Sequence, residues 1–137
     1  MKKLITTLLL LSMLSFGATI TIEVLNIKDK EGSLFVGLFN KEEGFPKNEN
    51  TYRSLVLEVN GTNMKMSFDD IPSGTYAIAL YHDENNNRVL DKNLFGIPSE
   101  DYAFSNNIKP MFSAPKFEEV QFEVNTTIEL SIQMNGN

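Results

Sequence analysis

Apolar and polar residues alternate along much of this chain, and a period of two residues predicts β-strands rather than helices. The alternation is clearest where Ile20, Ile22 and Val24 enclose Thr21 and Glu23. Seven segments are expected to form strands, namely residues 20–24, 34–39, 55–59, 64–68, 75–82, 120–124 and 128–134. Short strands separated by frequent turns favour an all-β fold. We therefore expect an antiparallel β-sandwich of about seven strands, with a closed barrel as the alternative.

Two turn signals suggest how neighbouring strands pair. Asn60-Gly61 lies between two alternating runs, which is the strongest short-range signal for a β-hairpin. Gly32-Ser33 introduces the second strand, which we expect to form a hairpin with the first. In the strand at residues 75–82, Ala77 and Ala79 are small and leave room for another segment to pack closely over them.

The longest connection runs from Asp91 to about Phe117 and shows no periodic pattern. Loops of this length are uncommon in compact domains unless they are functional or disordered. The apolar side chains in this connection are too many for a solvated linker, namely Leu94, Phe95, Ile97, Tyr102, Phe104, Ile108, Met111 and Phe112. We therefore expect one long ordered loop held against the sheet.

Oxygen-bearing groups recur at every second position where the strand at residues 75–82 ends. Asp83, Asn85, Asn87 and Asp91 supply carboxylate and amide oxygens, and Val89 would contribute its backbone carbonyl. Ca²⁺ accepts about six to eight oxygen ligands of such mixed types. The spacing therefore predicts a Ca²⁺ site in this loop.

Two positions depart from a regular Ca²⁺ loop. Counted from Asp83, the sixth position is Arg88, where a glycine normally makes the sharp turn, and the twelfth is Leu94 instead of a bidentate glutamate. Glu100 is the candidate for the missing ligand, with Asp101 or a water molecule as the reserve. The alternative is that the asparagines and aspartates cap turns through side-chain to backbone hydrogen bonds without any ion.

The single histidine, His82, is the only basis for a hydrolase, which would pair it with Asp83 and Ser105. Neighbouring residues of a strand point to opposite faces, so the side chains of His82 and Asp83 are poorly placed to bond to each other. We therefore do not expect an enzyme.

The first residues have the pattern of a secretory signal peptide. Lys2-Lys3 gives a basic start, and the apolar run Leu4–Leu14 is too short to span a bilayer comfortably. We expect a signal peptide at residues 1–17, cleaved after Gly17, and a single β-sandwich domain at residues 18–137 that is periplasmic or secreted. An uncleaved membrane anchor is the alternative, and no later segment could span a membrane.

The remaining chain is acidic and lacks cysteine. Loss of Lys2 and Lys3 would change the formal charge from −6 to −8. This charge repels nucleic acid and attracts cations or basic partners. Without cysteine the chain has no disulfide and no thiolate ligand or nucleophile.

Five stretches of the chain form a specific string of motifs. They are Gly74-Thr75-Tyr76-Ala77-Ile78-Ala79, the H-D-x-N-x-N-x-x-x-D run that begins at His82, Gly96-Ile97-Pro98-Ser99-Glu100, Phe104-Ser105-Asn106-Asn107 and Pro115-Lys116-Phe117-Glu118-Glu119. This string resembles the bacterial Domain of Unknown Function 2141 family, which usually shows glycine where this chain has Asn86 and Arg88. The resemblance implies a short exported β-protein without an assigned activity and with a transthyretin-like (prealbumin-like) sandwich.

Three classes of function follow from these observations. The leading class is an exported binding or interaction module whose Ca²⁺-organised loop presents side chains such as Tyr102 and Phe104 to a ligand or protein partner in the cell envelope. The second is a structural accessory domain of the cell envelope. The third, and least favoured, is a hydrolase that uses His82.

Overall fold

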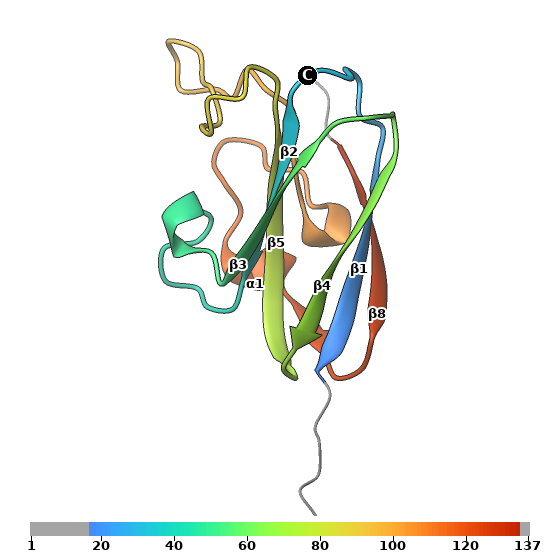
Figure 1. Cartoon of the computed structure of the whole chain (residues 1–137). Helices are drawn as coiled ribbons and strands as arrows, with labels where there is room; N and C mark the ends of the chain where they lie inside the picture. The colour runs from blue at the N-terminus through green and yellow to red at the C-terminus, as the bar shows by residue number, and fades with distance from the viewer. Residues whose placement is uncertain (1–16, 135–137) are drawn as a thin grey trace, which may run out of the picture.

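The computed structural model describes residues 17–134, and most of its regular secondary structure is β-strand (Figure 1). The strands are β1 (Ala18–Leu25), β2 (Ser33–Phe39), β3 (Arg53–Glu58), β4 (Met64–Ile71), β5 (Gly74–Asp83), β6 (Tyr102–Phe104), β7 (Phe122–Val124) and β8 (Ile128–Gln133). Three short helical turns accompany them, namely η1 (Asn48–Asn50), η2 (Ser105–Asn107) and α1 (Phe117–Val120). None of the helices within residues 17–134 is long and apolar enough to cross a bilayer. The all-β prediction is confirmed, whereas the predicted signal peptide lies, except for Gly17, outside the described residues.

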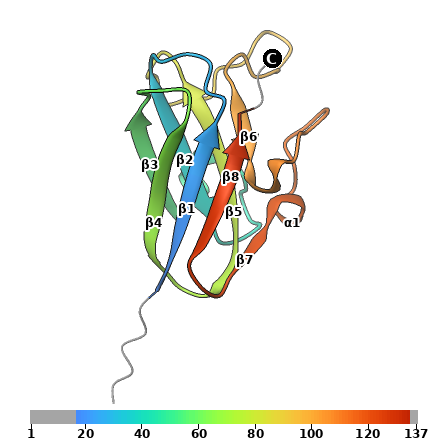
Figure 2. The ribbon, with the colours of Figure 1, turned by 90° about the vertical axis from the view of Figure 1, so that its right-hand side faces the viewer.

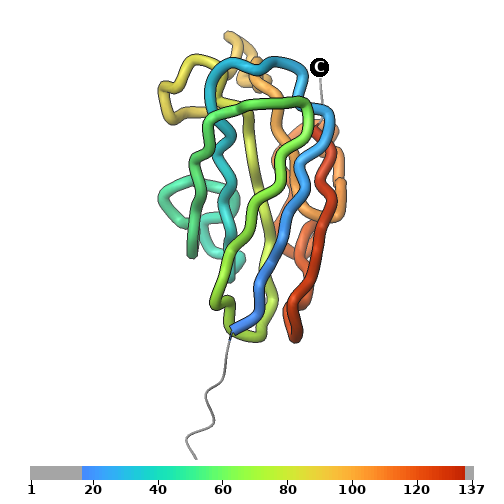
Figure 3. The backbone as a smooth tube through the Cα atoms, turned by 45° about the vertical axis from the view of Figure 1, so that its right-hand side comes forward, coloured from blue at the N-terminus to red at the C-terminus, as the bar shows by residue number. Residues whose placement is uncertain are grey.

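The strands form two sheets that pack against each other (Figures 2 and 3). One sheet has the order β4-β1-β8, and the other has the order β3-β2-β5-β6, with β7 also paired to β5. The main apolar core contains alternate residues of both sheets, such as Ile22 of β1, Val36 of β2 and Ile78 of β5. Among the described strands neither sheet closes into a barrel. The transthyretin-like arrangement stays a prediction.

The pairing of β1 corrects the expectation of a purely antiparallel sandwich. This strand pairs antiparallel with β4 on one side and parallel with β8 on the other, so that Ile22 faces Met66 and Leu130. The chain reaches β8 from β7, which belongs to the other sheet. No tight turn therefore forces β8 to run antiparallel to its neighbour.

The expected hairpin between the first two strands is wrong, because β1 and β2 belong to different sheets. The residues between them cross from one sheet to the other. Ile27 in this connection is buried, and its N–H donates to the Thr62 carbonyl at 2.8 Å. Burial of this apolar side chain draws the connection over the end of the core instead of allowing a tight turn.

The expected hairpin at Asn60-Gly61 is also wrong, because β3 and β4 lie in different sheets. A type I′ hairpin needs positive φ at both central residues, and neither Asn60 nor Gly61 has one. The preceding Val59 is buried and donates its N–H to the Gly32 carbonyl at 3.0 Å. The chain is thereby held across the end of the sandwich.

A second apolar cluster covers part of the outer face of the five-stranded sheet. Its buried members are Phe39, Ala77, Phe104, Phe117 and Val120, and Phe45, Ala79 and Tyr102 pack against them. The ring of Phe45 meets those of Phe39 and Phe117 edge-on, at centroid distances of 4.9 and 5.8 Å. The expectation that small residues of β5 admit close packing is confirmed.

Candidate functional site

The loop after β5 begins with a buried carboxylate. Asp83 is only 2% exposed. Its Oδ1 accepts the N–H of Asn87 at 3.1 Å, and its Oδ2 accepts the N–H of Arg88 at 2.8 Å. Asn86 and Arg88 both have positive φ, 54° and 66°. These are the positions where the sequence lacks the expected glycines, so the loop adopts the left-handed turn without them.

Asp91 closes the next part of the loop. Its two carboxylate oxygens accept the side-chain amide N–H groups of Asn85 and Asn87, each at 2.8 Å. The amide oxygens of the same two residues accept the backbone N–H groups of Asn87 and Val89 at 3.3 and 3.0 Å. The amide donors of Asn87 and Asn85 lower the pKa of Asp91, which therefore carries its negative charge at neutral pH.

Glu100 connects the start of the candidate loop, at Glu84, with its end, at Asp91. It is 4% exposed, and its two carboxylate oxygens accept the N–H groups of Glu84 at 3.2 Å and Asp91 at 3.1 Å. Burial is the main cause that raises the pKa of Glu100. The carboxylate selected from the sequence as a distant ligand thus lies at the candidate site.

The predicted cation-binding side chains are therefore brought together, but each already has a hydrogen-bond partner. Val89 enters the network through its N–H, which donates to the Asn87 side-chain oxygen. No three His, Cys, Asp or Glu side chains between residues 17 and 134 are grouped so that they could hold a metal ion. The oxygen-rich donor set suits Ca²⁺, yet a bound cation would have to replace the amide N–H groups that face Asp91. The bonds from backbone N–H groups to Asp83, Asn85, Asn87 and Glu100 are of the kind that the turn-capping alternative expects, and the Ca²⁺ site stays a prediction.

The three residues considered for a hydrolase are bonded elsewhere. His82 is 1% exposed, and its Nε2 lies 2.6 Å from the Glu31 carbonyl oxygen. The Oγ of Ser105, also buried, accepts the N–H of Ile78 at 3.0 Å and donates to the Val120 carbonyl. Asp83 likewise accepts two backbone N–H groups. The contacts of all three side chains therefore stabilise the fold.

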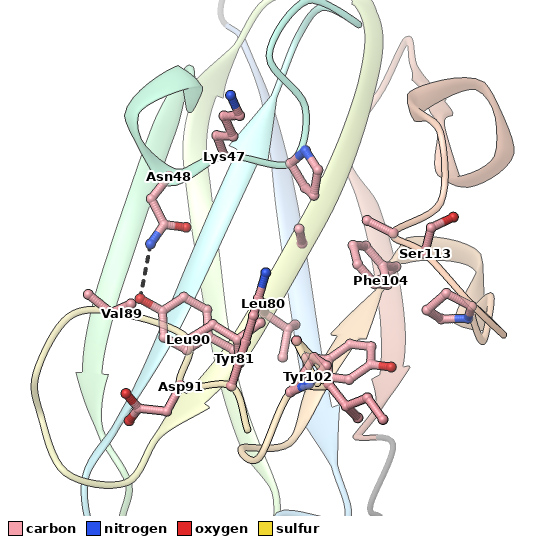
Figure 4. Close-up of a pocket in the computed structure, with 18 of the residues that line it drawn as sticks. Lys47, Asn48, Leu80, Tyr81, Val89, Leu90, Asp91, Tyr102, Phe104 and Ser113 are labelled. Carbon is pink, nitrogen blue, oxygen red and sulfur yellow. Dashed lines mark hydrogen bonds between the residues drawn. The ribbon is translucent and has the colours of Figure 1, made fainter. Parts of the chain in front are cut away.

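A cavity of about 870 Å³ lies beside the candidate loop, over the outer face of β5 and β6 (Figure 4). Ala79, Tyr81, Tyr102 and Phe104 line it from the sheet. Three connections supply its other walls, namely residues 46–48, 89–98 and 110–114. Its lining is mostly apolar, and its volume falls within the range of about 300–1,000 Å³ typical of small-molecule pockets.

Few polar groups reach this cavity. The side-chain amide of Asn48 donates to the Tyr81 hydroxyl at 3.0 Å, and this bond is the dashed line in Figure 4. Lys47, Lys92 and Asp91 also line it. The cavity therefore combines an aromatic floor with a small number of polar groups, which is the usual composition of a ligand site.

The loop's apolar residues do not all pack against the sheet as expected. Tyr102 and Phe104 do so, because β6 pairs with β5 and fixes their positions. The others are exposed, with fractions of 103% for Leu94, 87% for Phe95, 55% for Ile97, 37% for Ile108, 85% for Met111 and 98% for Phe112. Hydrogen bonds within the loop replace burial as the source of structure, since the Asn93 side chain accepts the N–H groups of Phe95 and Ile97.

The fold and the cavity define a small all-β protein of two packed sheets with a pocket of ligand size on its outer face. The chain belongs to the family described as an uncharacterized protein conserved in bacteria, Domain of Unknown Function 2141, whose model matches residues 22–131. The matched range contains the whole candidate loop and every segment that lines the cavity. No curated protein and no solved structure matches the chain.

Proposed function

We propose that this protein is an exported binding module that takes an apolar ligand into the cavity over β5 and β6. The observation that carries the proposal is the cavity itself, which has an aromatic floor and walls contributed by three separate connections. The lining of Tyr81, Tyr102 and Phe104 favours a ligand with an apolar or aromatic body. Periplasmic location or secretion belongs to the same proposal and is supported by the basic and apolar pattern at the start of the sequence.

Ca²⁺ is proposed as the organiser of one cavity wall. Asp83, Asn85, Asn87, Asp91 and Glu100 would hold it through side-chain oxygens, and Val89 would add its carbonyl. Support comes from the closeness of the five oxygen-bearing side chains, which their mutual contacts record, and from the ionised state favoured at Asp91. A bound cation would fix the loop against β5. The residues from Val89 to Asp91 line the cavity, so the same ion would set the shape of the ligand site.

Ligand binding in the cavity is tested with a variant whose larger side chain fills part of it. Ala79→Leu is expected to lower the affinity for anilinonaphthalene sulfonate, an apolar fluorescent probe, about tenfold, because the larger side chain occupies space at the floor. Fluorescence titration measures the affinity. Ser67→Leu is the matched control, because it adds the same side chain to an exposed position of β4 in the other sheet. Equal loss in both variants, or none in Ala79→Leu, would argue against ligand binding in this cavity.

Ca²⁺ binding is tested by measuring the free energy of unfolding of residues 18–137 in chelator, in Ca²⁺ and, as a control, in Mg²⁺. A ligand that binds only the folded state stabilises it by mass action. With a dissociation constant of ~10⁻⁴ to 10⁻³ M, typical of extracellular Ca²⁺ sites, about 10 mM Ca²⁺ should add about 1.4 to 2.7 kcal/mol to the free energy of unfolding. Asp91→Asn should reduce this gain, because the substitution removes one ligand charge while it keeps the size of the side chain nearly unchanged.

The alternative is a structural accessory domain whose loop is capped by hydrogen bonds alone. It is favoured by the complete set of partners that Asp83, Asp91 and Glu100 have among the described residues. In that case Ca²⁺ would not change the unfolding midpoint, and Ala79→Leu would bind the probe as well as the parent does. The unfolding experiment and the fluorescence titration therefore separate the two functions.

A further inference from the structure

Four apolar side chains project from two of the three connections that line the cavity, residues 89–98 and 110–114. Leu94 and Phe95 belong to one connection and are 103% and 87% exposed, and Met111 and Phe112 belong to the other and are 85% and 98% exposed. In Figure 1 both connections, yellow and orange, lie on the side of the molecule away from the sheet β4-β1-β8. Phe95, Met111 and Phe112 all line the same cavity, so the two connections are neighbours.

Such exposure needs an explanation, because monomeric proteins rarely expose several large apolar side chains close together unless the surface binds something. The local structure does not account for it. The turn that carries Leu94 and Phe95 is held by its own backbone, where the Asn93 N–H donates to the Ile97 carbonyl at 2.8 Å and Gly96 has φ of +75°. The turn thus presents these side chains to solvent without relying on their burial.

Charge is distributed unevenly around the same connections. Residues 88–116 carry four basic and three acidic side chains, whereas residues 18–87 and 117–137 carry six basic and fifteen acidic ones. Two of the three acids, Asp91 and Glu100, have both carboxylate oxygens occupied by N–H donors. Lys92 and Lys109 are exposed, and each lies two residues before one of the two apolar pairs. This part of an acidic protein is therefore the part that an anionic surface repels least.

We infer that the protein docks on the surface of an anionic phospholipid bilayer by inserting Leu94, Phe95, Met111 and Phe112 among the lipid chains. The side chains project as two pairs from separate connections, and a bilayer can yield around such projections, whereas a protein partner would need a matching pocket for each pair. Lys92 and Lys109 would remain at the level of the lipid phosphates, where each basic side chain adds to attraction. Docking in this orientation turns the cavity toward the membrane, and it requires neither Ca²⁺ nor a cavity ligand.

The experiment measures co-sedimentation of residues 18–137 with vesicles. This range contains every strand of the described structure and omits the apolar run at the start of the sequence, which would bind lipid by itself. We expect binding to vesicles of phosphatidylglycerol and phosphatidylcholine, weaker binding to phosphatidylcholine alone, and weaker binding at high salt. Absence of binding to both vesicles would overturn the inference.

Variants identify the surface. Phe95→Ser combined with Phe112→Ser should weaken binding to the anionic vesicles at least tenfold, because two aromatic side chains no longer leave water. Val56→Ser is the matched control, since it removes an exposed apolar side chain of β3, 39% exposed and outside both connections, and should bind as the parent does. Unchanged binding by the double serine variant would overturn the inference.

Charge variants and sedimentation velocity complete the test. Lys92→Gln with Lys109→Gln should reduce both the affinity and its salt dependence, whereas Lys65→Gln on β4 should change neither. If the parent forms dimers that the double serine variant cannot form, and binds no vesicles, then the four side chains pack against a second copy of the chain and the bilayer inference is wrong. Both phenylalanines are exposed, so equal melting temperatures should show that the double serine variant is folded.

Discussion

Phe39→Ala is expected to lower the free energy of unfolding by about 3–5 kcal/mol, the cost of deleting a large aromatic side chain from a packed interior. Phe39 is 1% exposed although it belongs to the outer cluster and not to the main core between the sheets. Its ring contacts the Phe45 ring at 4.9 Å and 85°, and it is paired in register with Ala77. Its removal should leave a void that the short helical turn α1 cannot fill.

Urea denaturation measures this effect, and two matched variants interpret it. Phe68→Ala removes a ring that is 1% exposed in the main core and should cost a similar amount, whereas Phe112→Ala removes a ring that is 98% exposed and should cost almost nothing. If Phe39→Ala behaved like Phe112→Ala, the outer cluster would not be a packed layer. The cavity beside it would then lack a rigid floor.

The faces of the strands could be predicted from the sequence because the period of two residues is a local property. The predicted strand at residues 75–82 corresponds to β5 at Gly74–Asp83. Ile78 and Leu80 enter the main core, and Ala77, on the opposite face of the strand, lies under the outer cluster. Each of these outcomes follows from which side of one strand a residue occupies.

The partners of the strands could not be predicted, because alternation does not tell which strand lies beside which. The parallel neighbour of Ile22 is Leu130, a residue from the other end of the chain. Asn60-Gly61 misled because its hairpin signal is local, whereas burial of Ile27 and Val59 directs the two connections across the sandwich. Tertiary packing outweighed turn propensity at both places.

The candidate loop was partly predictable for a similar reason. Oxygen-bearing side chains at every second position indicated that Asp83, Asn85, Asn87 and Asp91 act together, and the network joins them. The cavity was not predicted, because it depends on connections far apart in the sequence that meet over one face of β5. Composition also could not distinguish the packed Phe104 from exposed apolar residues of the same connection.

Gly32→Ala is expected to destabilise the protein by about 2–4 kcal/mol, because two separate penalties act at this position. Gly32 has φ of +77°, a region that L-residues with a Cβ avoid. A Cβ there would also overlap the Asp83 carbonyl oxygen and lie 2.6 Å from the Glu84 Cα. Both atoms belong to the backbone where the candidate loop leaves β5, so relief of the overlap must displace the loop.

Two other glycines separate these penalties in one urea denaturation series. Gly96→Ala retains the first penalty alone, since Gly96 has φ of +75° with no atom within 4 Å of a Cβ, and it should cost about 1–2 kcal/mol. Gly61→Ala should be nearly neutral, because its φ is not positive and the nearest atom would be 3.6 Å away. The expected order of destabilisation is therefore Gly32, Gly96 and Gly61. Equal costs at Gly32 and Gly96 would contradict the close approach of Gly32, just before β2, to the backbone of Asp83 and Glu84. The packing of β2 against the end of β5 would then not fix the start of the candidate loop.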